Sequence, residues 1–215
     1  MATLDTNLKS DSVADMTTKT HRLTRLILSA AFTTVLPAIV LAQVPSDLAT
    51  KKDFSAGRAS STDPNLHNGD ARRIDPGQTL PLLDVTGNGR ITHVWFTIDA
   101  PSPEHLRELV LRMTWDDATR PAVECPVGDF FAQGHGKYVE FQSAAVSVGS
   151  RNALNCYWPM PFKKHAVITV SNEGEKPVNS YYFNIDYRLE PHSQPDARYF
   201  HTQYHTYFPA PVGQA

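Results

Sequence analysis

The stretch RITHVWFTIDA at residues 90–100 decides the fold class of this chain. Its side chains alternate between two faces, and bulky groups occur on both of them. One face carries Ile91, His93, Trp95 and Thr97, and the other carries Thr92, Val94, Phe96 and Ile98. A strand that is apolar on both faces is typical of the centre of a sheet inside a sandwich. The stretch therefore predicts a central β-strand.

Further strands are predicted on either side of this one, at spacings of roughly 8–15 residues. They span residues 80–85, 109–115, 122–127, 138–148, 152–157, 166–171, 178–189 and 197–207. Turn-forming glycine and asparagine residues separate several of them, as at residues 86–89. A turn of helix is expected at residues 104–106. The pattern predicts an all-β jelly roll or β-sandwich of about eight or nine mostly antiparallel strands.

Residues 1–42 are predicted to be a signal peptide, because a basic segment precedes an apolar stretch that ends in small residues. Met16 would start a signal of ordinary length. The alternative is a membrane anchor, but the apolar stretch at 26–42 is short against the about 20 residues of a span. We therefore expect cleavage near Gln43. The mature protein would be periplasmic or secreted, with no stable membrane span after cleavage.

The exported part is predicted to contain three segments. Residues 43–77 are rich in Ser, Asp, Asn, Gly and Pro, and they are expected to form a polar arm. Residues 78–207 would form the jelly-roll domain. Residues 208–215 resemble a linker, and this tail is typical of the exit from one domain toward another.

The charge balance gives no electrostatic case for two classes of partner. Lys and Arg total 20 against 22 for Asp and Glu, so neither nucleic acid nor an anionic membrane surface is favoured. A hydrophobic fraction of 41% is sufficient for a core.

Cys125 and Cys156 either form a disulfide in an oxidising compartment or remain as two buried thiols. Their spacing matches no metal-binding pattern, so no metal and no cofactor are expected.

The first candidate site is the run GDFFAQGHG at residues 128–136. An acidic and aromatic run between glycines predicts a loop at the end of a strand, where functional residues are often carried. Asp129, beside Phe130, is a candidate to orient a sugar hydroxyl or act as a base, and capping a turn is the alternative. His135, between two glycines, is either a site residue or a solvated loop residue.

The second candidate site contains Arg151 and Asn152, followed by Asn155, Tyr157 and Trp158. Aromatic rings next to amides and a guanidinium are typical of carbohydrate sites, since a ring stacks on the apolar face of a sugar while amides bind its hydroxyls. The alternative is a buried aromatic corner in which two prolines fix a turn.

No catalytic set is evident from the residues themselves. Glycoside hydrolysis needs two carboxylates about 5–10 Å apart. The candidates are Asp116, Asp117, Glu124, Asp129, Glu140 and Asp186, and no pair among them stands out. The chain also contains no GxSxG motif, so a serine triad is unsupported.

Four ordered motifs resemble glycoside hydrolase family 172, which was formerly a domain-of-unknown-function family. They are ITHVWFTI at 91–98, LVLRMTWD at 109–116, VGDFF with GHG at 127–131 and 134–136, and NCYWPMPF at 155–162. The segments AVITVSNEG at 166–174 and YYFNIDY at 181–187 complete the resemblance, which covers about residues 55–207. The arm at 60–70 departs from the family's usual sequence.

This resemblance implies a jelly-roll fold, usually with two jelly rolls in each chain, and trimer-based homo-oligomers. It implies retaining hydrolysis of α-fructofuranosides or arabinofuranosides by two glutamates. In the family these glutamates lie in the later part of the chain, and neither maps onto a residue here. A furanose-containing oligosaccharide or glycan is therefore the expected partner.

Three interpretations follow from the resemblance. In the first, the chain is the N-terminal jelly-roll portion of an exported furanoside-active glycoside hydrolase, inactive alone. In the second, it is a non-catalytic secreted carbohydrate-binding or assembly module. In the third, a downstream reading frame supplies a C-terminal half in trans. The residues alone leave it uncertain whether the chain is an enzyme.

Overall fold

The computed structural model describes residues 49–192 and 195–206. The predicted signal peptide and the predicted tail at 208–215 lie outside the described residues. All described strands and helices belong to the unit Lys52–Ala215. No helix in this described part is both long and apolar enough to cross a membrane.

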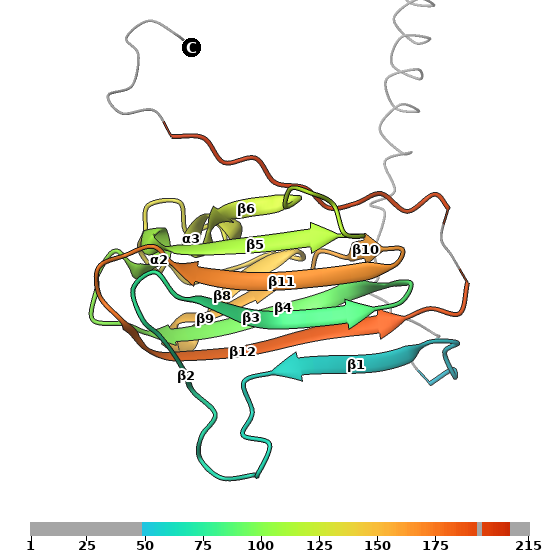
Figure 1. The fold of residues 1–215 in the computed structure, drawn as a ribbon, viewed down its shortest axis with the longest axis horizontal. Helices are drawn as coiled ribbons and strands as arrows, with labels where there is room; N and C mark the ends of the chain where they lie inside the picture. The colour runs from blue at the N-terminus through green and yellow to red at the C-terminus, as the bar shows by residue number, and fades with distance from the viewer. Residues whose placement is uncertain (1–48, 193–194, 207–215) are drawn as a thin grey trace, which may run out of the picture. The chain divides into compact units, whose positions relative to one another are not determined.

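The strands form two antiparallel sheets that pack face to face (Figure 1). The order in sheet A is β1 (Ser55–Ser60), β12 (Val178–Leu189), β4 (Gly89–Asp99), β9 (Ala153–Cys156), β8 (Val146–Gly149) and β7 (Phe141–Gln142). Two further strands join it, β2 (Arg72–Ile74) on β12 and β10 (Met160–Phe162) on β4. The order in sheet B is β3 (Thr79–Thr86), β11 (His165–Asn172), β5 (Leu109–Trp115) and β6 (Val123–Pro126).

The chain crosses repeatedly between the two sheets, as in a jelly roll. It passes from β3 in sheet B to β4 in sheet A, returns for β5 and β6, and forms β7 to β10 in sheet A. It then crosses to β11 and back to β12. Short helices α2 (His105–Glu108) and α3 (Val127–Phe130) and the 3₁₀ turn η1 (Ser150–Asn152) lie in the connections. The predicted all-β sandwich class is confirmed.

One continuous core lies between the sheets, because alternate residues of each strand face inward. On β5 the pattern is strict, with Leu109, Leu111, Met113 and Trp115 buried and the residues between them partly exposed. The largest fully buried side chains include Tyr181, Phe96 and Phe131. Burial of such apolar surface stabilises a fold by about 25 cal/mol per Å².

A β-bulge in β4 changes which face its first residues occupy. His93 pairs with Asp186 and Ile91 pairs with Tyr187, so Thr92 is an extra residue opposite β12. The Thr92 hydroxyl donates to the carbonyl of Asp186 at 3.2 Å. As a result Ile91 is fully buried while His93 lies on the outer face of sheet A. The prediction that Ile91 shares a face with His93 is therefore wrong, since a bulge interrupts the two-residue period.

The described residues form twelve strands, more than the eight or nine expected. Part of the predicted polar arm belongs to sheet A, because β1 pairs with β12 through six residues and β2 pairs with its start. The short strand β10 lies in a run with two prolines and was not expected. Strand β1 was not predicted because its residues are mostly polar. Its outward side chains are solvated at the edge of the sheet.

The predicted last strand at 197–207 is wrong for its described residues, which have no strand structure. Residues 197–206, called the strap here, run as an extended segment beside β5 and β6 (Figure 1). The strap is attached mainly through side chains. Trp115 Nε1 donates to the carbonyl of Phe200 at 2.8 Å. A backbone bond also joins the Thr202 N–H to the carbonyl of Ala122 at 3.1 Å. The alternation of the strap residues thus reflects contacts with sheet B rather than a ladder.

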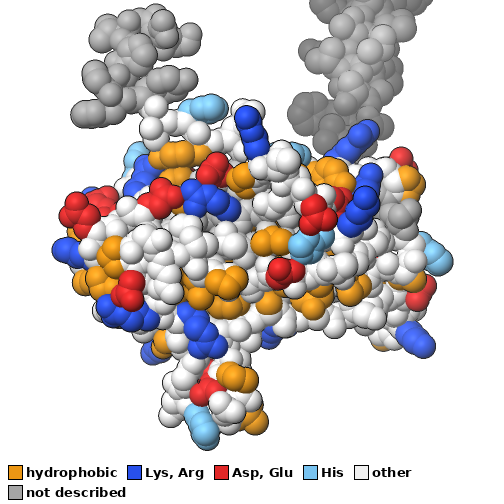
Figure 2. Space-filling view, viewed as in Figure 1, with side chains coloured by type: hydrophobic (Ala, Val, Ile, Leu, Met, Phe, Trp, Pro, Cys, Tyr) orange, Lys and Arg blue, Asp and Glu red, His pale blue; other side chains and the backbone are white. Residues whose placement is uncertain are grey.

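Side chains of opposite charge are interspersed on one face of the molecule. Figure 2 shows acidic, basic and hydrophobic side chains mixed over the face in view. This arrangement agrees with the net charge of −2.

Candidate functional site

A small pocket lies where β6, α3, the β9–β10 connection and the strap meet, and it is called the Asp129 pocket here. Its cavity volume is about 210 Å³. The lining residues are Cys125, Asp129, Phe130, Trp158, Phe200, Thr202, Gln203 and Tyr204. Pockets for drug-sized ligands usually measure about 300–1,000 Å³, so this one suits a smaller ligand. It joins residues of both candidate sites predicted from the sequence, since Asp129 and Phe130 of the first site line the same pocket as Trp158 of the second.

The carboxylate of Asp129 is held by Arg107 of α2. Arg107 Nη1 donates to Oδ2 at 3.0 Å and to Oδ1 at 3.3 Å. The same nitrogen donates to the hydroxyl oxygen of Tyr204 at 3.0 Å, and Nη2 donates to the carbonyl of Gly134. Burial raises the pKa of Asp129, and Arg107 opposes that shift only in part. The pocket therefore contains an oriented carboxylate that is less acidic than a free one.

Gly128 permits the close approach of α2 and α3 that brings Arg107 to Asp129. A Cβ at position 128 would lie 2.9 Å from the Cβ of Leu106 and 3.0 Å from its carbonyl oxygen. Contacts this short with backbone require the neighbour to move. The glycine that opens the GDFF run is therefore needed for helix packing, while the aspartate that follows it faces the pocket.

Aromatic rings form one wall of the pocket. Phe130 meets Phe200 edge to face, with ring centroids 6.2 Å apart, and Trp158 lies 6.4 Å from Phe200 at 37°. Trp158 is 49% exposed, which is unusual for so large an apolar side chain. Such a ring is available to stack on the apolar face of a ligand.

The comparisons with known proteins identify the family. A model described as GH172 domain-like matches residues 66–185, which is more than half of the chain. The chain belongs to the GH172 family. No curated protein matches it. The expected membership of glycoside hydrolase family 172 is thus confirmed.

The GH172 chain also has a weak structural likeness to a viral protein. A chain in a structure of the infectious bursal disease virus Gx strain is 11% identical to it, with a TM-score of 0.32. The match covers 70% of this chain and 36% of the viral chain, so this chain spans about a third of that protein's length. A likeness at this level does not establish a shared fold or function.

The two cysteines of this GH172 domain are free and buried. Of the two alternatives that the sequence left open, the structure thus has the buried thiols and not the disulfide. Burial raises the pKa of the Cys125 thiol, in the wall of the pocket, to about 11. Burial also raises the pKa of Cys156 to about 11. Both thiols are therefore protonated at neutral pH, and a protonated thiol is a poor nucleophile. Within the described residues no group of three His, Cys, Asp or Glu side chains is placed to hold a metal ion.

Asn155 and Tyr157 lie outside the pocket, on the outer face of sheet A. There the Tyr157 ring stacks on His93 with centroids 4.6 Å apart and an interplanar angle of 5°. Asn155 Oδ1 is 3.1 Å from His93 Nε2. His93 also approaches Asp186, whose carboxylate pairs with Arg58 of β1. The fold of the GH172 domain therefore divides the second candidate site between two surfaces, the Asp129 pocket and the outer face of sheet A.

The remaining predicted residues stand apart from both groups. Arg151 and Asn152 are exposed in η1, at the opposite end of β9 from Tyr157, and both have a left-handed backbone. The carbonyl of Arg151 accepts from the Thr97 hydroxyl at 3.4 Å. His135 is exposed on a loop and is not among the residues that line the pocket.

Sequence reasoning missed several residues of both surfaces. Arg107 stands in a short helix with no motif of its own, and Gln203 and Tyr204 were assigned to a strand. Arg58 lies in the predicted arm. None of these positions has a local pattern that indicates chemistry, because their roles depend on contacts between distant segments.

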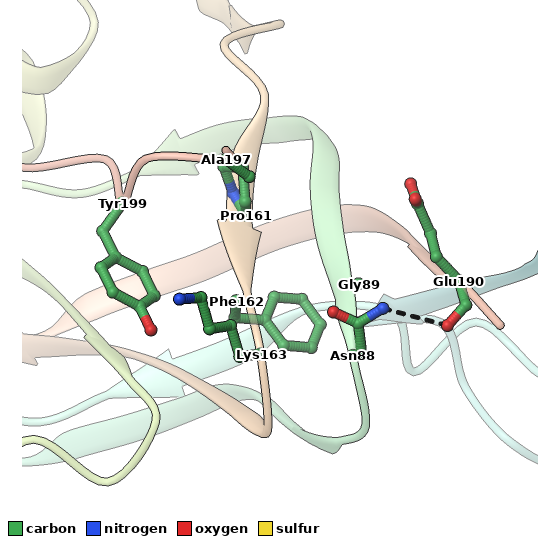
Figure 3. A pocket seen from close by; sticks show the side chains of 8 residues that line it. All are labelled: Asn88, Gly89, Pro161, Phe162, Lys163, Glu190, Ala197 and Tyr199. Atoms are coloured by element: carbon green, nitrogen blue, oxygen red, sulfur yellow. Dashed lines mark hydrogen bonds between the residues drawn. The ribbon is translucent and has the colours of Figure 1, made fainter. Parts of the chain in front are cut away.

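Two other pockets lie along the strap. One is narrow and is lined by residues that include Asn88, Phe162, Lys163 and Tyr199 (Figure 3). In this pocket the Asn88 side chain donates to the carbonyl of Glu190 at 3.1 Å, so the Asn88 amide is already bonded to the backbone. The other, beside Asp116 and Arg120, has a cavity volume of about 420 Å³ and is open. Neither pocket contains a residue that the sequence singled out as a sugar contact.

Proposed function

We propose that this GH172 domain binds one furanose unit of a neutral glycan in the Asp129 pocket, without hydrolysing it. The domain would act as the jelly-roll portion of an exported furanoside-active glycoside hydrolase. The observation that carries the proposal is the meeting of the exposed Trp158 ring with the Arg107–Asp129 pair at one small pocket.

The lining chemistry matches what a sugar ring presents. Trp158 and Phe200 offer apolar surface to the carbon-bound hydrogens of the ring. Asp129 accepts hydrogen bonds, and the amide of Gln203 both donates and accepts, so neighbouring hydroxyls can be bound together. A ligand of one five-membered ring also fits a cavity of about 210 Å³.

Binding rather than hydrolysis is proposed because the pocket lining has a single carboxylate. Retaining glycosidases need two, about 5–5.5 Å apart. Asp129 is the one acidic residue among the eight that line the pocket, and Arg107 already pairs with it. A second jelly roll elsewhere in the assembly would then supply the catalytic carboxylates. Trimer-based assembly is part of this proposal.

Export to the periplasm or the cell exterior is also proposed. Its support is the basic segment followed by the apolar stretch at residues 26–42. N-terminal sequencing of the protein purified from its natural host tests this directly. A mature N-terminus near residue 43 is expected, and an intact N-terminus in the cytoplasm would contradict it.

Calorimetric titration tests the binding proposal. Methyl α-D-arabinofuranoside and methyl α-D-fructofuranoside should bind the wild-type protein, and Trp158→Ala should weaken that binding about tenfold. Leu66→Ala, at an exposed loop position, is the matched control and should bind as the wild type does. Equal affinity of Trp158→Ala and wild type for both glycosides would overturn the proposal.

A further inference from the structure

A row of polar side chains crosses the outer face of sheet A from β1 to β9. Arg58 donates to Asp186 through Nε at 2.5 Å and Nη2 at 2.9 Å. His93 Nδ1 lies 3.3 Å from Asp186, and His93 Nε2 lies 3.1 Å from Asn155. Each side chain thus holds its neighbour in one orientation. The row and the ring of Tyr157 are called the sheet A platform here.

Aromatic surface lies directly on this row. Tyr157 is 46% exposed although its ring stacks in parallel on His93, and its hydroxyl is 3.4 Å from Asn155. Trp95 is the next outward residue of β4, since Val94 and Phe96 on either side of it are buried. It pairs across the sheet with Asn155 on one side and Asn184 on the other. The face therefore alternates rings with amides.

Fold stability does not account for this arrangement. The Arg58 side chain is 58% exposed, and ion pairs in water contribute only about 0–1 kcal/mol. A ring left 46% exposed likewise loses much of the benefit of burial. What the contacts do provide is order: the rings and amides are fixed before a ligand arrives, which lowers the entropic cost of binding.

The charges of the platform indicate an uncharged ligand. The positive Arg58 and negative Asp186 satisfy one another, so the row offers no net charge to a polyanion or a polycation. Fixed rings beside amide groups complement a neutral polyol, whose hydroxyls both donate and accept.

The platform and the Asp129 pocket lie on either side of the segment that contains Tyr157 and Trp158. Tyr157 and Trp158 are adjacent in the chain, yet Tyr157 stacks on His93 of the platform while Trp158 lines the pocket. Both rings are about half exposed. A glycan of several units that extends from the pocket past residues 157–158 would therefore reach the platform.

We infer that the sheet A platform binds further sugar units of the same neutral glycan whose furanose unit occupies the Asp129 pocket. The ligand is then an oligosaccharide rather than a single sugar. This inference rests on the proposed function for the class of ligand. It assigns Tyr157 and Asn155 to the binding of units beyond the first.

Affinity as a function of chain length tests the inference. The probes are methyl α-D-arabinofuranoside and α-1,5-linked arabinofuranose oligosaccharides of increasing length, titrated into the full chain. Wild-type affinity should rise with length. Tyr157→Ala should lose that gain, about five- to tenfold, and keep its affinity for the monosaccharide. His93→Ala, which removes the ring beneath Tyr157, should act in the same way, and Leu66→Ala should match the wild type.

The outcomes separate the two proposals. No binding of any probe would contradict the proposed function itself. Binding of the monosaccharide with no gain from length, or a gain that Tyr157→Ala retains, would overturn the inference alone. Sedimentation velocity supplies a further check. If Tyr157→Ala instead converts an oligomer to a monomer, the platform is an interface between copies of this chain, and the inference is overturned.

Discussion

Arg107 in α2 and Asp129 in α3 join the two short helices across their junction, with 3.0 Å between Nη1 and Oδ2. This ion pair sets the position of the only carboxylate that lines the candidate pocket. It also connects the strap to the sandwich, since the same guanidinium nitrogen contacts Tyr204. The geometry of the pocket therefore depends on a contact between segments distant in sequence.

The stability of the fold should depend on the protonation of Asp129. Burial raises its folded-state pKa above the unfolded value of about 3.9. The contribution of Asp129 is then fully favourable below that value and is lost as pH rises through the raised folded pKa. Asp129→Asn keeps an oxygen acceptor for Arg107 but does not titrate. Denaturation between about pH 3 and pH 7 should show wild-type stability falling relative to Asp129→Asn; a relative rise would contradict this.

Gly128→Ala should destabilise the protein by about 1–3 kcal/mol, because the new Cβ would press on Leu106. Urea unfolding measures this. Gly134→Ala is the matched control, since the nearest atom to a Cβ there is an Asp129 oxygen at 3.8 Å, an ordinary contact. If both variants lose the same stability, the close approach at Gly128 is not the cause.

Asp116→Asn should destabilise the turn between β10 and β11 by about 1–3 kcal/mol. The Asp116 carboxylate accepts backbone N–H bonds from Lys163 at 2.9 Å, Lys164 at 2.6 Å and His165 at 3.1 Å. Asparagine preserves the left-handed backbone at position 116 but not the charge.

The control for this variant is Asp117→Asn, at a neighbouring left-handed position with a 70% exposed side chain. The effect of Asp116 should also depend on pH. Burial opposes its ionisation, yet bonds from Tyr199 and the backbone outweigh burial and lower its pKa. Its stabilisation is therefore present above about pH 4 and is lost as pH falls through the lowered folded pKa. A variant that is equally destabilised under acid and neutral conditions would refute this account.

The purified protein should not hydrolyse aryl α-arabinofuranosides or aryl α-fructofuranosides, because the lining of the Asp129 pocket has one carboxylate where two are needed. Release of the aryl group, followed by absorbance, measures this. Turnover that persists through purification and disappears in Asp129→Asn would show that the pocket is catalytic.

The sandwich class could be predicted because alternation of apolar residues survives in long strands. β4, β5, β11 and β12 lie within a residue or two of their expected bounds. Short or polar strands such as β1 and β10 could not, since an edge strand needs few buried side chains. The strap was wrongly predicted as a strand because its alternating aromatics pack on sheet B without a ladder.

Part of the candidate site could be predicted in the same sense. Asp129, Phe130 and Trp158 were singled out by residue type, and the fold brings them to one pocket. Tyr157 was grouped with Trp158, but adjacent side chains on an extended segment point to opposite sides. Arg107 was missed because its role comes from the packing of α2 on α3, which no local pattern encodes.

The central claim is that a furanose unit binds in the Asp129 pocket, and the three tryptophans of the chain allow a direct test. In a spectrum of ¹⁵N-labelled protein, each indole N–H gives its own signal. Titration with methyl α-D-arabinofuranoside should shift the signal of Trp158 saturably and leave that of Trp95, on the sheet A platform side, in place. A Trp158 signal that stays fixed while the sugar binds would contradict the account.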